Sequence, residues 1–548
     1  MLYTVVYASI VDGADNTMGL NLPNNAITRF ATAHPTLTAT VGGVAATYIF
    51  FSALLQFTQD ANEPPLAATT IPFLSPILGM IKWSTGFYTH MRDKYQNLPI
   101  YTLRIPGARL YIVNSTNLIP IVQRQWRTLL FPPVSARASE VAMGGSKKAL
   151  DIIRGDMVTD SGFMHDFIKA IHPALSNGAA LNALNSKALQ VFTTSLDEIV
   201  ARGPRTVKLF EWIGHEFLMA TTDSVYGLRN PLRDPRNEAD WNKFHPTIMF
   251  LMLNLLPLWA FRSAINARNR LAKSFQDYHA NGHYKEGSVY IQRWTEHFVG
   301  RGISPDDIGR FHNGGLFALV ANTSPTAFWT VFNIFSDPSV TEDCRKEVLQ
   351  IVTVDEENGV QTYTVKAQSL NDCCPTLVST FQEVFRVHGI ANSVRVANED
   401  YMLDSKYLIR KGGMVMMPAR VQHRLKEVWG EDVDEFDARR FIRKPGEPRP
   451  NPIAFRGFGG GTTLCPGRHF ATAEILLFTA ILLLRFDILP AQGGEWLKPS
   501  TEKSSQAEAM EQPDHDIEVE LRPRPGAERR WRVSFEGTGE ATLVTEDL

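Results

Sequence analysis

The sequence predicts a mainly α-helical protein with small β-sheets, preceded by a single membrane-spanning helix. Three observations support this prediction. Over much of residues 162–338, apolar residues recur three and four positions apart, which is the spacing of helices that bury one face. Two short runs, 101–105 and 110–113, flank a Pro-Gly turn and predict a β-hairpin. Residues 37–57 are uncharged and apolar, and about 20 such residues cross a bilayer as a helix.

The order of these segments predicts four parts. Residues 1–36 form a polar tail, 37–57 a transmembrane anchor, 58–80 a stiff proline-rich hinge, and 81–548 one large domain without internal repeats. A buried core helix is the alternative for the anchor, but the segments beside it offer no packing partner. The flanking charges, Arg29 before it and Asp60 and Glu63 after it, leave its orientation undetermined.

Composition argues against two classes of protein. The 55 lysines and arginines nearly balance the 57 aspartates and glutamates, which argues against a nucleic-acid binder. The four cysteines, at 344, 373, 374 and 465, have the spacing of neither a disulfide framework nor a Cys-x-x-Cys zinc site. This cysteine usage is typical of a protein in a reducing compartment.

Three further elements are expected within the large domain. Ser304 and Pro305, followed by two aspartates, mark the start of a helix that should run through Phe335. The apolar segment 248–261 is too short to span a bilayer, so we expect core, with a lip at the membrane face as the alternative. The runs 516–520 and 531–535 surround a proline- and glycine-containing turn and predict a terminal hairpin.

The most informative run surrounds Cys465. It reads Phe458-Gly459-Gly460-Gly461-Thr462-Thr463-Leu464-Cys465-Pro466-Gly467-Arg468-His469-Phe470-Ala471. Glycines let the backbone approach a flat ligand, and N–H groups at the start of the following helix stabilise a negative sulfur. A thiolate that is the sole protein ligand of a haem iron needs that combination. A buried structural cysteine is the alternative, and the glycine-rich order before a helix favours the haem ligand.

This run resembles the haem-binding signature of the cytochrome P450 superfamily, in its membrane-anchored eukaryotic form. The resemblance implies the cytochrome P450 fold, haem b as cofactor, and Cys465 as the axial ligand of the iron. It makes residues 81–548 a haem-thiolate catalytic domain, cytosolic and held at the endoplasmic reticulum membrane by one transmembrane pass. The residues expected to hold the haem are Cys465, Phe458, Gly459, Gly461, Gly467, Arg468 and Arg395.

The resemblance also implies a buried structural triad that supports the haem loop. Its members would be Glu383, Arg386 and Arg440. Glu383 and Arg386 stand three residues apart on one helical face, where they can pair. Asp437 and Ala438 stand where a proline is frequent in the family, but Arg440 is retained.

The haem propionates need cationic partners, and here the chain departs from the family. Arg395, in a strand after the triad helix, is expected to reach a propionate because its planar fork suits a carboxylate. Two residues before the cysteine the family commonly has Arg or His, and this chain has Thr463. Lys169 or His172, on an earlier helix, is a candidate substitute, with a solvated surface as the alternative for each.

The helix on the oxygen side of the haem is unusual. Residues 317–329 take the place of the superfamily's Ala-Gly-x-Asp/Glu-Thr-Thr, in which an acid and an alcohol supply protons for oxygen activation. Here Pro325 replaces the threonine and preserves a kink by freeing a carbonyl. The candidate catalytic residues are Asn322, Thr323, Ser324 and Thr326. The Ala-Asn-Thr-x-Pro-x-x-Phe-Trp pattern is similar to the branch of sterol 7α-hydroxylases and prostacyclin synthase.

Two enzyme classes fit this pattern. A monooxygenase takes electrons from NADPH through NADPH-cytochrome P450 reductase and inserts one oxygen atom into a C–H bond. A peroxide isomerase or dehydratase of the prostacyclin-synthase kind needs no reductase, and the lost acid–alcohol pair favours it. We favour the monooxygenase because hydroxylases of this branch share the Asn and the Pro. A non-catalytic haem carrier or sensor is the least favoured class.

Two sets of residues are expected to meet partners. A cluster of cations favours docking of an acidic electron donor, with a solvated charged face as the alternative. These cations are Arg439, Arg443, Lys444, Arg449, Arg456 and Arg468, with Glu447 as the nearest acid. The residues expected to line the substrate pocket are Phe311, Leu316, Phe317, His388 and Asn392. They suit a bulky lipophile with one polar handle, such as a steroid, terpenoid or polyketide, although ordinary core is the alternative for the apolar ones.

Overall fold

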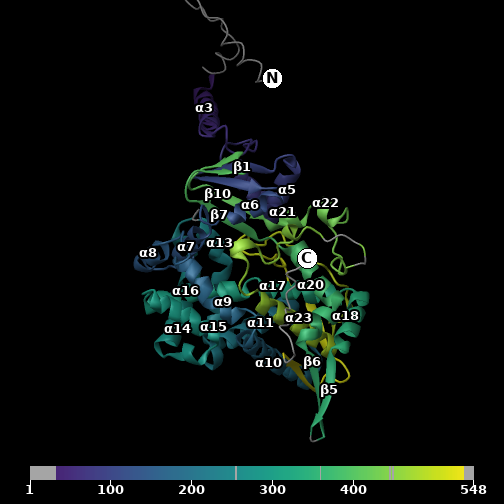
Figure 1. Cartoon of the computed structure of the whole chain (residues 1–548). Coiled ribbons are helices and arrows are strands. Elements are labelled where there is room, and N and C mark those ends of the chain that lie inside the picture. The colour runs from purple at the N-terminus through teal and green to yellow at the C-terminus, as the bar shows by residue number, and fades with distance from the viewer. Residues whose placement is uncertain (1–32, 254–255, 358, 444–445, 447–449, 536–548) are drawn as a thin grey trace, which may run out of the picture. The chain divides into compact units, whose positions relative to one another are not determined.

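The computed structural model describes residues 33–253, 256–357, 359–443, 446 and 450–535. The chain divides into two compact units, an N-terminal unit and a body. The N-terminal unit comprises Met1–Gln59 with Thr70–Pro72, and the body comprises Asp60–Thr69 with Phe73–Leu548. Within the body, Figure 1 shows strands β1, β7 and β10 gathered at one end and helices filling most of the remainder.

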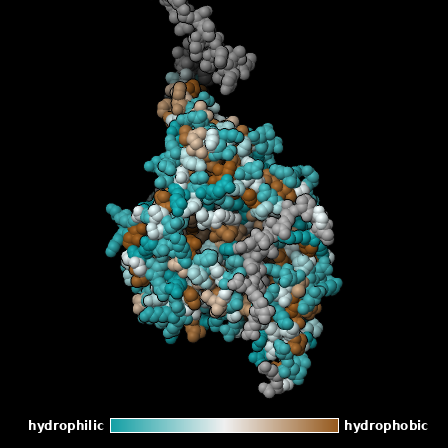
Figure 2. Space-filling model, in the orientation of Figure 1, coloured by the Kyte–Doolittle hydropathy of each residue, from teal (hydrophilic) through white to brown (hydrophobic). Residues whose placement is uncertain are grey.

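The N-terminal unit contains the predicted membrane helix. Helix α3 (Pro35–Phe57, Figure 1) has no charged residue. Its apolar side chains are almost all exposed, as the space-filling view indicates (Figure 2). By length and composition it can cross a membrane, and among the described residues it is the one helix that can. The predicted single apolar helix is therefore confirmed, with a start two residues earlier than expected.

The body is mainly helical, as predicted. Its helices are α4 (Ser75–Trp83), α5 (Phe87–Lys94), α6 (Leu118–Arg124), α7 (Pro132–Val141), α8 (Lys147–Arg154), α9 (Phe163–Leu175), α10 (Ala179–Arg202), α11 (Leu209–Tyr226), α12 (Pro235–Phe244), α13 (Ile248–Leu253), α14 (Arg262–Ala280), α15 (Val289–Gly300), α16 (Pro305–Val320), α17 (Thr323–Phe335), α18 (Pro338–Gln350), α19 (Leu370–Cys373), α20 (Pro375–His388), α21 (Ala419–His423), α22 (Lys426–Trp429) and α23 (Arg468–Arg485). Helix α16 begins as the sequence indicates, because Ser304 Oγ accepts the Asp307 N–H at 3.2 Å.

Small sheets complete the body. The first has the order β1 (Ile100–Ile105), β2 (Ala108–Val113), β10 (Met414–Pro418), β7 (Asn392–Ala397) and β3 (Leu129–Leu130). A second sheet has the order β11 (Phe486–Pro490), β12 (Glu518–Pro523) and β4 (Arg205–Lys208). A third has the order β13 (Arg530–Ser534), β6 (Val360–Lys366) and β5 (Val352–Glu357). Strands β8 (Tyr401–Leu403) and β9 (Tyr407–Ile409) form a two-stranded sheet. The predicted β1–β2 hairpin is confirmed, with Ile105 opposite Ala108 and Gly107 in a left-handed turn at φ +74°.

The predicted C-terminal hairpin is wrong. Strand β12 pairs antiparallel with β11 and β4, whereas β13 pairs parallel with β6 in another sheet. The turn between them is fixed on the end of α23, because Arg485 Nε donates to the carbonyl of the fully buried Ala527 at 3.0 Å. Each strand therefore pairs with a segment far away in sequence.

The single helix expected from Ser304 through Phe335 is broken into α16 and α17. The break falls at Ala321 and Asn322. Pro325 has no N–H to donate to the carbonyl of Ala321, so the regular hydrogen-bond ladder cannot continue. The kink that the proline predicts is present, and it is sharp enough to end one helix and start another.

The expectation that segment 248–261 is core is wrong for most of its described residues. Ile248 and Leu251 are buried, but Leu258 is 59% and Trp259 78% exposed. Helix α13 is less than two turns long, so only one narrow face can reach the core. Residues 254–255 lie outside the described part of the chain.

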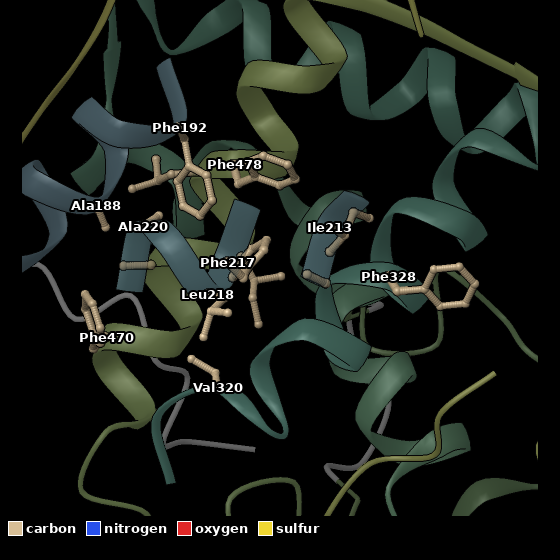
Figure 3. Packing of buried hydrophobic residues seen from close by; sticks show 14 of the residues in the cluster. Ala188, Phe192, Ile213, Phe217, Leu218, Ala220, Val320, Phe328, Phe470 and Phe478 are labelled. Atoms are coloured by element: carbon tan, nitrogen blue, oxygen red, sulfur yellow. The ribbon is translucent and has the colours of Figure 1, made fainter. Parts of the chain in front are cut away.

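The largest hydrophobic core surrounds α23. In Figure 3, Phe478 of α23 lies near Phe192 of α10 and Phe217 of α11. The centroid of the Phe478 ring is 4.7 Å from that of Phe192 and 5.1 Å from that of Phe217. Such aromatic clusters bury large apolar areas and fix the helices that carry them. Helix α23 follows directly after Cys465, so this core fixes the position of the cysteine loop.

Candidate active site

The glycine-rich loop before α23 is closed by its own backbone. Cys465 N–H donates to the carbonyl of Phe458 at 3.0 Å. Gly459 and Gly461 have φ values of +83° and +60°, a conformation that side chains with a Cβ disfavour. The ring of Phe458 packs on Phe385 of α20 at 4.7 Å between centroids. The loop is therefore shaped by two glycines and attached to the helix of the triad.

The sulfur of Cys465 lies where backbone donors converge. Burial raises the pKa of the Cys465 thiol, while the N–H groups of Gly467 and Arg468 and the Arg468 charge act in the opposite direction. The Arg468 guanidinium also donates to the Cys465 carbonyl at 3.3 Å. A thiolate held by backbone N–H groups at the start of a helix fits the axial ligand of a haem iron.

The structure brings the three triad residues together. Arg386 donates two hydrogen bonds to the Glu383 carboxylate, at 2.6 and 2.7 Å, and both side chains are fully buried. Arg440 Nε donates to the same carboxylate at 3.0 Å, and so does the backbone N–H of Asp437. A buried carboxylate with several donors is compensated for the loss of water.

The triad also holds the segment that leads to the cysteine loop. Arg386 donates to the carbonyls of Val433 at 2.6 Å and Glu435 at 2.9 Å, and Arg440 donates to that of Trp429 at 2.9 Å. These bonds attach residues 429–440 to α20. Asp437 contributes through its backbone, so the local departure from the family's proline leaves the arrangement intact.

Arg395 lies beside the cysteine loop on β7. Its side chain is 1% exposed and donates to Thr463 Oγ1 at 2.7 Å. Burial lowers its pKa to about 10, with a further contribution from the charge of Arg456. Thr463, which stands where the family commonly has a cation, therefore contacts the neighbouring arginine.

The two alternative cations suggested by the sequence are solvated. Lys169 and His172 are exposed on α9. Lys169 Nζ donates to the carbonyl of Asp160 at 3.0 Å, and the His172 ring contacts Ser176 Oγ at 3.0 Å. The alternative of a solvated face is thus the one observed for both residues.

The oxygen-side residues are engaged with the backbone. Thr323 Oγ1 donates to the carbonyl of Leu319 at 2.9 Å, and Thr326 Oγ1 to that of Asn322 at 2.6 Å. The Asn322 side-chain oxygen accepts the N–H of Ala509 at 2.7 Å. Asn322 thus joins the helix break to the loop that precedes β12, and Ser324 lies half-buried in the first turn of α17.

A buried carboxylate that the sequence did not single out fixes the same loop. Glu511 contacts His388 Nδ1 at 3.2 Å, accepts Thr85 Oγ1 at 3.1 Å, and pairs closely with Arg420. Burial opposes its ionisation, but His388 and Arg420 lower the pKa of Glu511 to about 2. His388 was expected in the substrate pocket, but Thr85, Arg420 and Glu511 are far apart in sequence and follow no motif, so the sequence carries no signal for their meeting.

The five residues expected in the substrate pocket lie in different environments. Phe311 packs on Phe298, with ring centroids 5.7 Å apart, and Leu316 is fully buried. Phe317 is half-buried and faces His245 at 5.7 Å between rings. His388 is buried and stacks on Trp329 with centroids 3.9 Å apart. Asn392 begins β7, and its Oδ1 is buried with no hydrogen-bond partner among the described residues.

A second pair that the sequence did not single out lies next to Phe317. His245 Nε2 is 3.1 Å from Glu508 Oε1, and Trp241 stacks on the His245 ring at 4.9 Å. His245 Nε2 and Glu508 Oε2 are buried without hydrogen-bond partners among the described residues. Glu508 precedes Ala509, the residue bonded to Asn322. A polar pair therefore lies beside the apolar oxygen-side helix.

The predicted cation cluster is only partly a surface. Arg456 is 4% exposed, so it cannot belong to a docking face. Arg439 pairs with Asp343 at 2.5 Å, and Arg443 is exposed. Arg468 lies half-buried beside Cys465. Lys444, Arg449 and Glu447 lie outside the described residues.

Together, the helical body, the glycine-rich cysteine loop and the buried carboxylate–arginine triad define a haem-thiolate enzyme. Residues 244–515 match the Cytochrome P450 family. Cytochrome P450 monooxygenase nodJ of Hypoxylon pulicicidum is 33% identical over 475 residues, which are 85% of this chain and 90% of that protein. The chain therefore belongs to the cytochrome P450 family, and it is a monooxygenase of the oxidoreductase class.

Animal relatives agree with the branch that the sequence indicates. Cytochrome P450 7B1 of Mus musculus is 26% identical over 490 residues, 83% of this chain and 91% of that protein. The 7-alpha-hydroxycholest-4-en-3-one 12-alpha-hydroxylase of Oryctolagus cuniculus is 23% identical over 494 residues, 85% of this chain and 94% of that protein. The resemblance to the sterol 7α-hydroxylase branch is confirmed.

Proposed function

We propose that this protein uses O₂ and electrons from NADPH, delivered by NADPH-cytochrome P450 reductase, to oxidise a bulky lipophilic substrate such as a steroid, terpenoid or polyketide. The observation that carries this proposal is the placement of Cys465 at the start of α23, with the N–H groups of Gly467 and Arg468 directed at its sulfur. Phe458, Gly459, Gly461 and Arg395 would complete the haem site. Haem bound there would supply the oxygen-activating chemistry of the family.

The cysteine assignment has a direct spectroscopic test. Reduced protein treated with carbon monoxide should show the red-shifted Soret band of a thiolate-ligated haem, because sulfur donates electron density to iron. Cys465→His or Cys465→Ala should abolish that band. Retention of the band in either variant, with haem still bound, would assign the iron ligand to another residue. Cys373→Ala, at a half-buried cysteine, is the matched control and should leave the band unchanged.

The chain's own groups would select and position the substrate. Phe317 provides apolar surface on the oxygen-side helix, and Glu508, whose Oε1 contacts His245, provides a buried Oε2 without a hydrogen-bond partner among the described residues. Buried polar atoms without partners favour a ligand that supplies the missing hydrogen bond. We therefore propose that the polar handle of the substrate is a hydroxyl or amino group held by Glu508 and His245.

The proton relay on the oxygen side is also a proposal. Thr323 and Thr326 donate their hydroxyl protons to carbonyls but keep oxygen lone pairs that can accept from a water molecule. Ser324 is the remaining hydroxyl in this turn. Asn322 positions the loop of Ala509 through its side-chain oxygen, which supports a positioning role for it.

Peroxide isomerisation is the second candidate function. The absence of an acid at Ser324 and of an alcohol at Pro325 favours it, because rearrangement of a hydroperoxide needs no delivered protons. Product formation with NADPH and reductase should be compared with product formation from a substrate hydroperoxide alone. We expect turnover in the first assay. Turnover in the second assay alone would replace the monooxygenase proposal by the isomerase.

We further propose that α3 anchors the protein in the endoplasmic reticulum membrane, with the body in the cytosol. The length and composition of α3 support the anchor. All four cysteines are free, which supports a reducing compartment. The exposed Leu258 and Trp259 support contact of the body's surface with the membrane. Protease protection of the N-terminus, but not of the body, in sealed microsomes would test the topology.

A further inference from the structure

Arg456 is a buried guanidinium that no acidic side chain in the described part of the chain compensates. Its side chain is 4% exposed, and its terminal Nη2 has no hydrogen-bond partner among the described residues. Burial lowers the pKa of Arg456 to about 10, so the side chain is still a cation near neutral pH. A buried cation without a counter-ion is strongly destabilising, and native proteins place an anion beside it.

The environment of Arg456 is the inner side of the cysteine loop. A Cβ atom placed on Gly460 would lie 3.2 Å from both terminal nitrogens of Arg456. The same Cβ would lie 2.9 Å from Nε2 of Gln123, which lies in the last turn of α6 and whose Nε2 also has no hydrogen-bond partner among the described residues. Two unpartnered donors, one charged and one neutral, thus converge on a glycine of the haem loop.

Arg395 extends this group of donors. It is bonded to Thr463 Oγ1 at 2.7 Å, and Thr463 in turn donates to the Gly460 carbonyl at 3.2 Å. The charges of Arg395 and Arg456 repel each other, since each lies near the other and both are buried. No carboxylate among the described residues pairs with either arginine. Within the described part of the chain, the two arginines therefore lack an anionic partner, which a haem propionate would supply.

We propose that Arg456, assisted by Gln123, binds the haem propionate that an Arg or His two residues before the cysteine would bind in other family members. The proposal rests on haem binding at Cys465. It names a cation for the propionate that Thr463, as an uncharged residue, cannot neutralise. The two propionate carboxylates of haem match the two buried guanidiniums of Arg395 and Arg456 in number and charge. Charge-assisted hydrogen bonds between a guanidinium and a carboxylate are strong. The guanidinium of Arg456 lies beside Gly460, close to the short side chain of Thr463.

The decisive measurement is haem retention. Arg456→Gln removes the charge and the terminal guanidinium nitrogens and should accelerate haem transfer to excess apomyoglobin by roughly ten- to a hundredfold, the loss expected for one hydrogen bond to a charged group. The propionate bending bands in the resonance Raman spectrum should shift in the same variant. Thr463→Arg introduced into Arg456→Gln should restore slow transfer, because it returns a cation to the family's usual position.

Arg439→Gln is the matched control. Arg439 is bonded to Asp343 at the surface, so haem transfer should be unchanged. Unaltered transfer and unaltered propionate bands in Arg456→Gln would overturn the proposal. Where Arg456→Gln fails to retain haem during purification, recovery of the haem-loaded protein by Thr463→Arg supports the proposal, and failure of that rescue overturns it.

The thiolate band separates this proposal from the function on which it rests. Arg456→Gln should retain the red-shifted band of the reduced carbon monoxide complex, because the iron ligand is untouched. Loss of haem retention with the band preserved assigns Arg456 to the propionate. Absence of the band from the unaltered protein would instead reject Cys465 as the ligand, whatever the behaviour of Arg456.

Discussion

Glu508 carries a carboxylate oxygen that is buried and has no hydrogen-bond partner among the described residues. Its other oxygen lies 3.1 Å from His245, and the two side chains come from segments more than 250 residues apart in sequence. An unpaired buried acceptor is costly unless a ligand supplies a donor. At the scale of single residues, this makes Glu508 the chain's candidate determinant of substrate polarity.

Glu508→Gln should therefore discriminate between ligands. Binding of a steroid that bears one hydroxyl should weaken by roughly tenfold, because the amide offers one acceptor oxygen where the carboxyl group has two. Binding of the deoxygenated counterpart should stay the same. Titration of the haem spin state measures both affinities. Equal weakening for the two compounds would show that Glu508 does not contact the hydroxyl, and Glu502→Gln, at an exposed position of the same loop, is the control.

At the scale of elements, the break between α16 and α17 is coupled to the loop before β12. Asn322 accepts the Ala509 N–H at 2.7 Å, Trp329 Nε1 donates to the Glu511 carbonyl at 2.8 Å, and Glu511 N–H donates to the His388 carbonyl at 2.9 Å. The loop has no regular secondary structure over these residues, so such bonds replace a sheet ladder. The broken helix and α20 together determine where it lies.

Asn322→Ala should loosen this loop without unfolding the protein. Loss of the half-buried acceptor leaves the Ala509 N–H without its partner, which costs about 1 kcal/mol. Hydrogen exchange at Ala509 should become faster by the corresponding factor. Asn322→Asp keeps an acceptor oxygen at the same place and should preserve the slow exchange. Slow exchange in both variants would show that other contacts hold the loop.

At the scale of the whole molecule, buried histidines make stability depend on pH. His279 Nε2 and His312 Nε2 are 2.6 Å apart inside the helical body, and Tyr226 Oη lies 3.3 Å from His312 Nδ1. Burial lowers the pKa of His279 to about 4 and that of His312 well below its ordinary value. Both rings are therefore neutral in the folded protein, and one donates to the other.

The thermal midpoint should accordingly fall as the pH is lowered from about 6.5 to about 4. In that window the unfolded chain binds protons that the folded protein excludes, and each histidine contributes up to about 1.4 kcal/mol per pH unit. Above about pH 6.5 the pair should have no effect. His312→Phe should flatten the profile, whereas His172→Phe, at an exposed position on α9, should leave it unchanged. A profile equally steep in His312→Phe would assign the dependence to other groups.

Local patterns predicted much of this protein. The apolar run of α3, the β1–β2 turn and the start of α16 depend on neighbouring residues, and all three are present in the structure. The terminal hairpin failed because β12 and β13 take partners from distant segments, which no local pattern encodes. Segment 248–261 was mistaken for core because apolar composition does not reveal which residues find a partner.

The cysteine loop follows from local sequence, because the glycines, Cys465 and the start of α23 are contiguous and their backbone geometry is local. The sequence also indicated that Glu383 and Arg386 could pair, because one helical turn separates them. Two further arrangements arise from the packing of distant segments: Arg456 is buried against Gly460 near Arg395, and Glu508 contacts His245. Burial and charge compensation depend on how distant segments pack. For this reason Arg456, which the sequence places in an exposed cation cluster, is buried in the structure and is proposed to bind an anion.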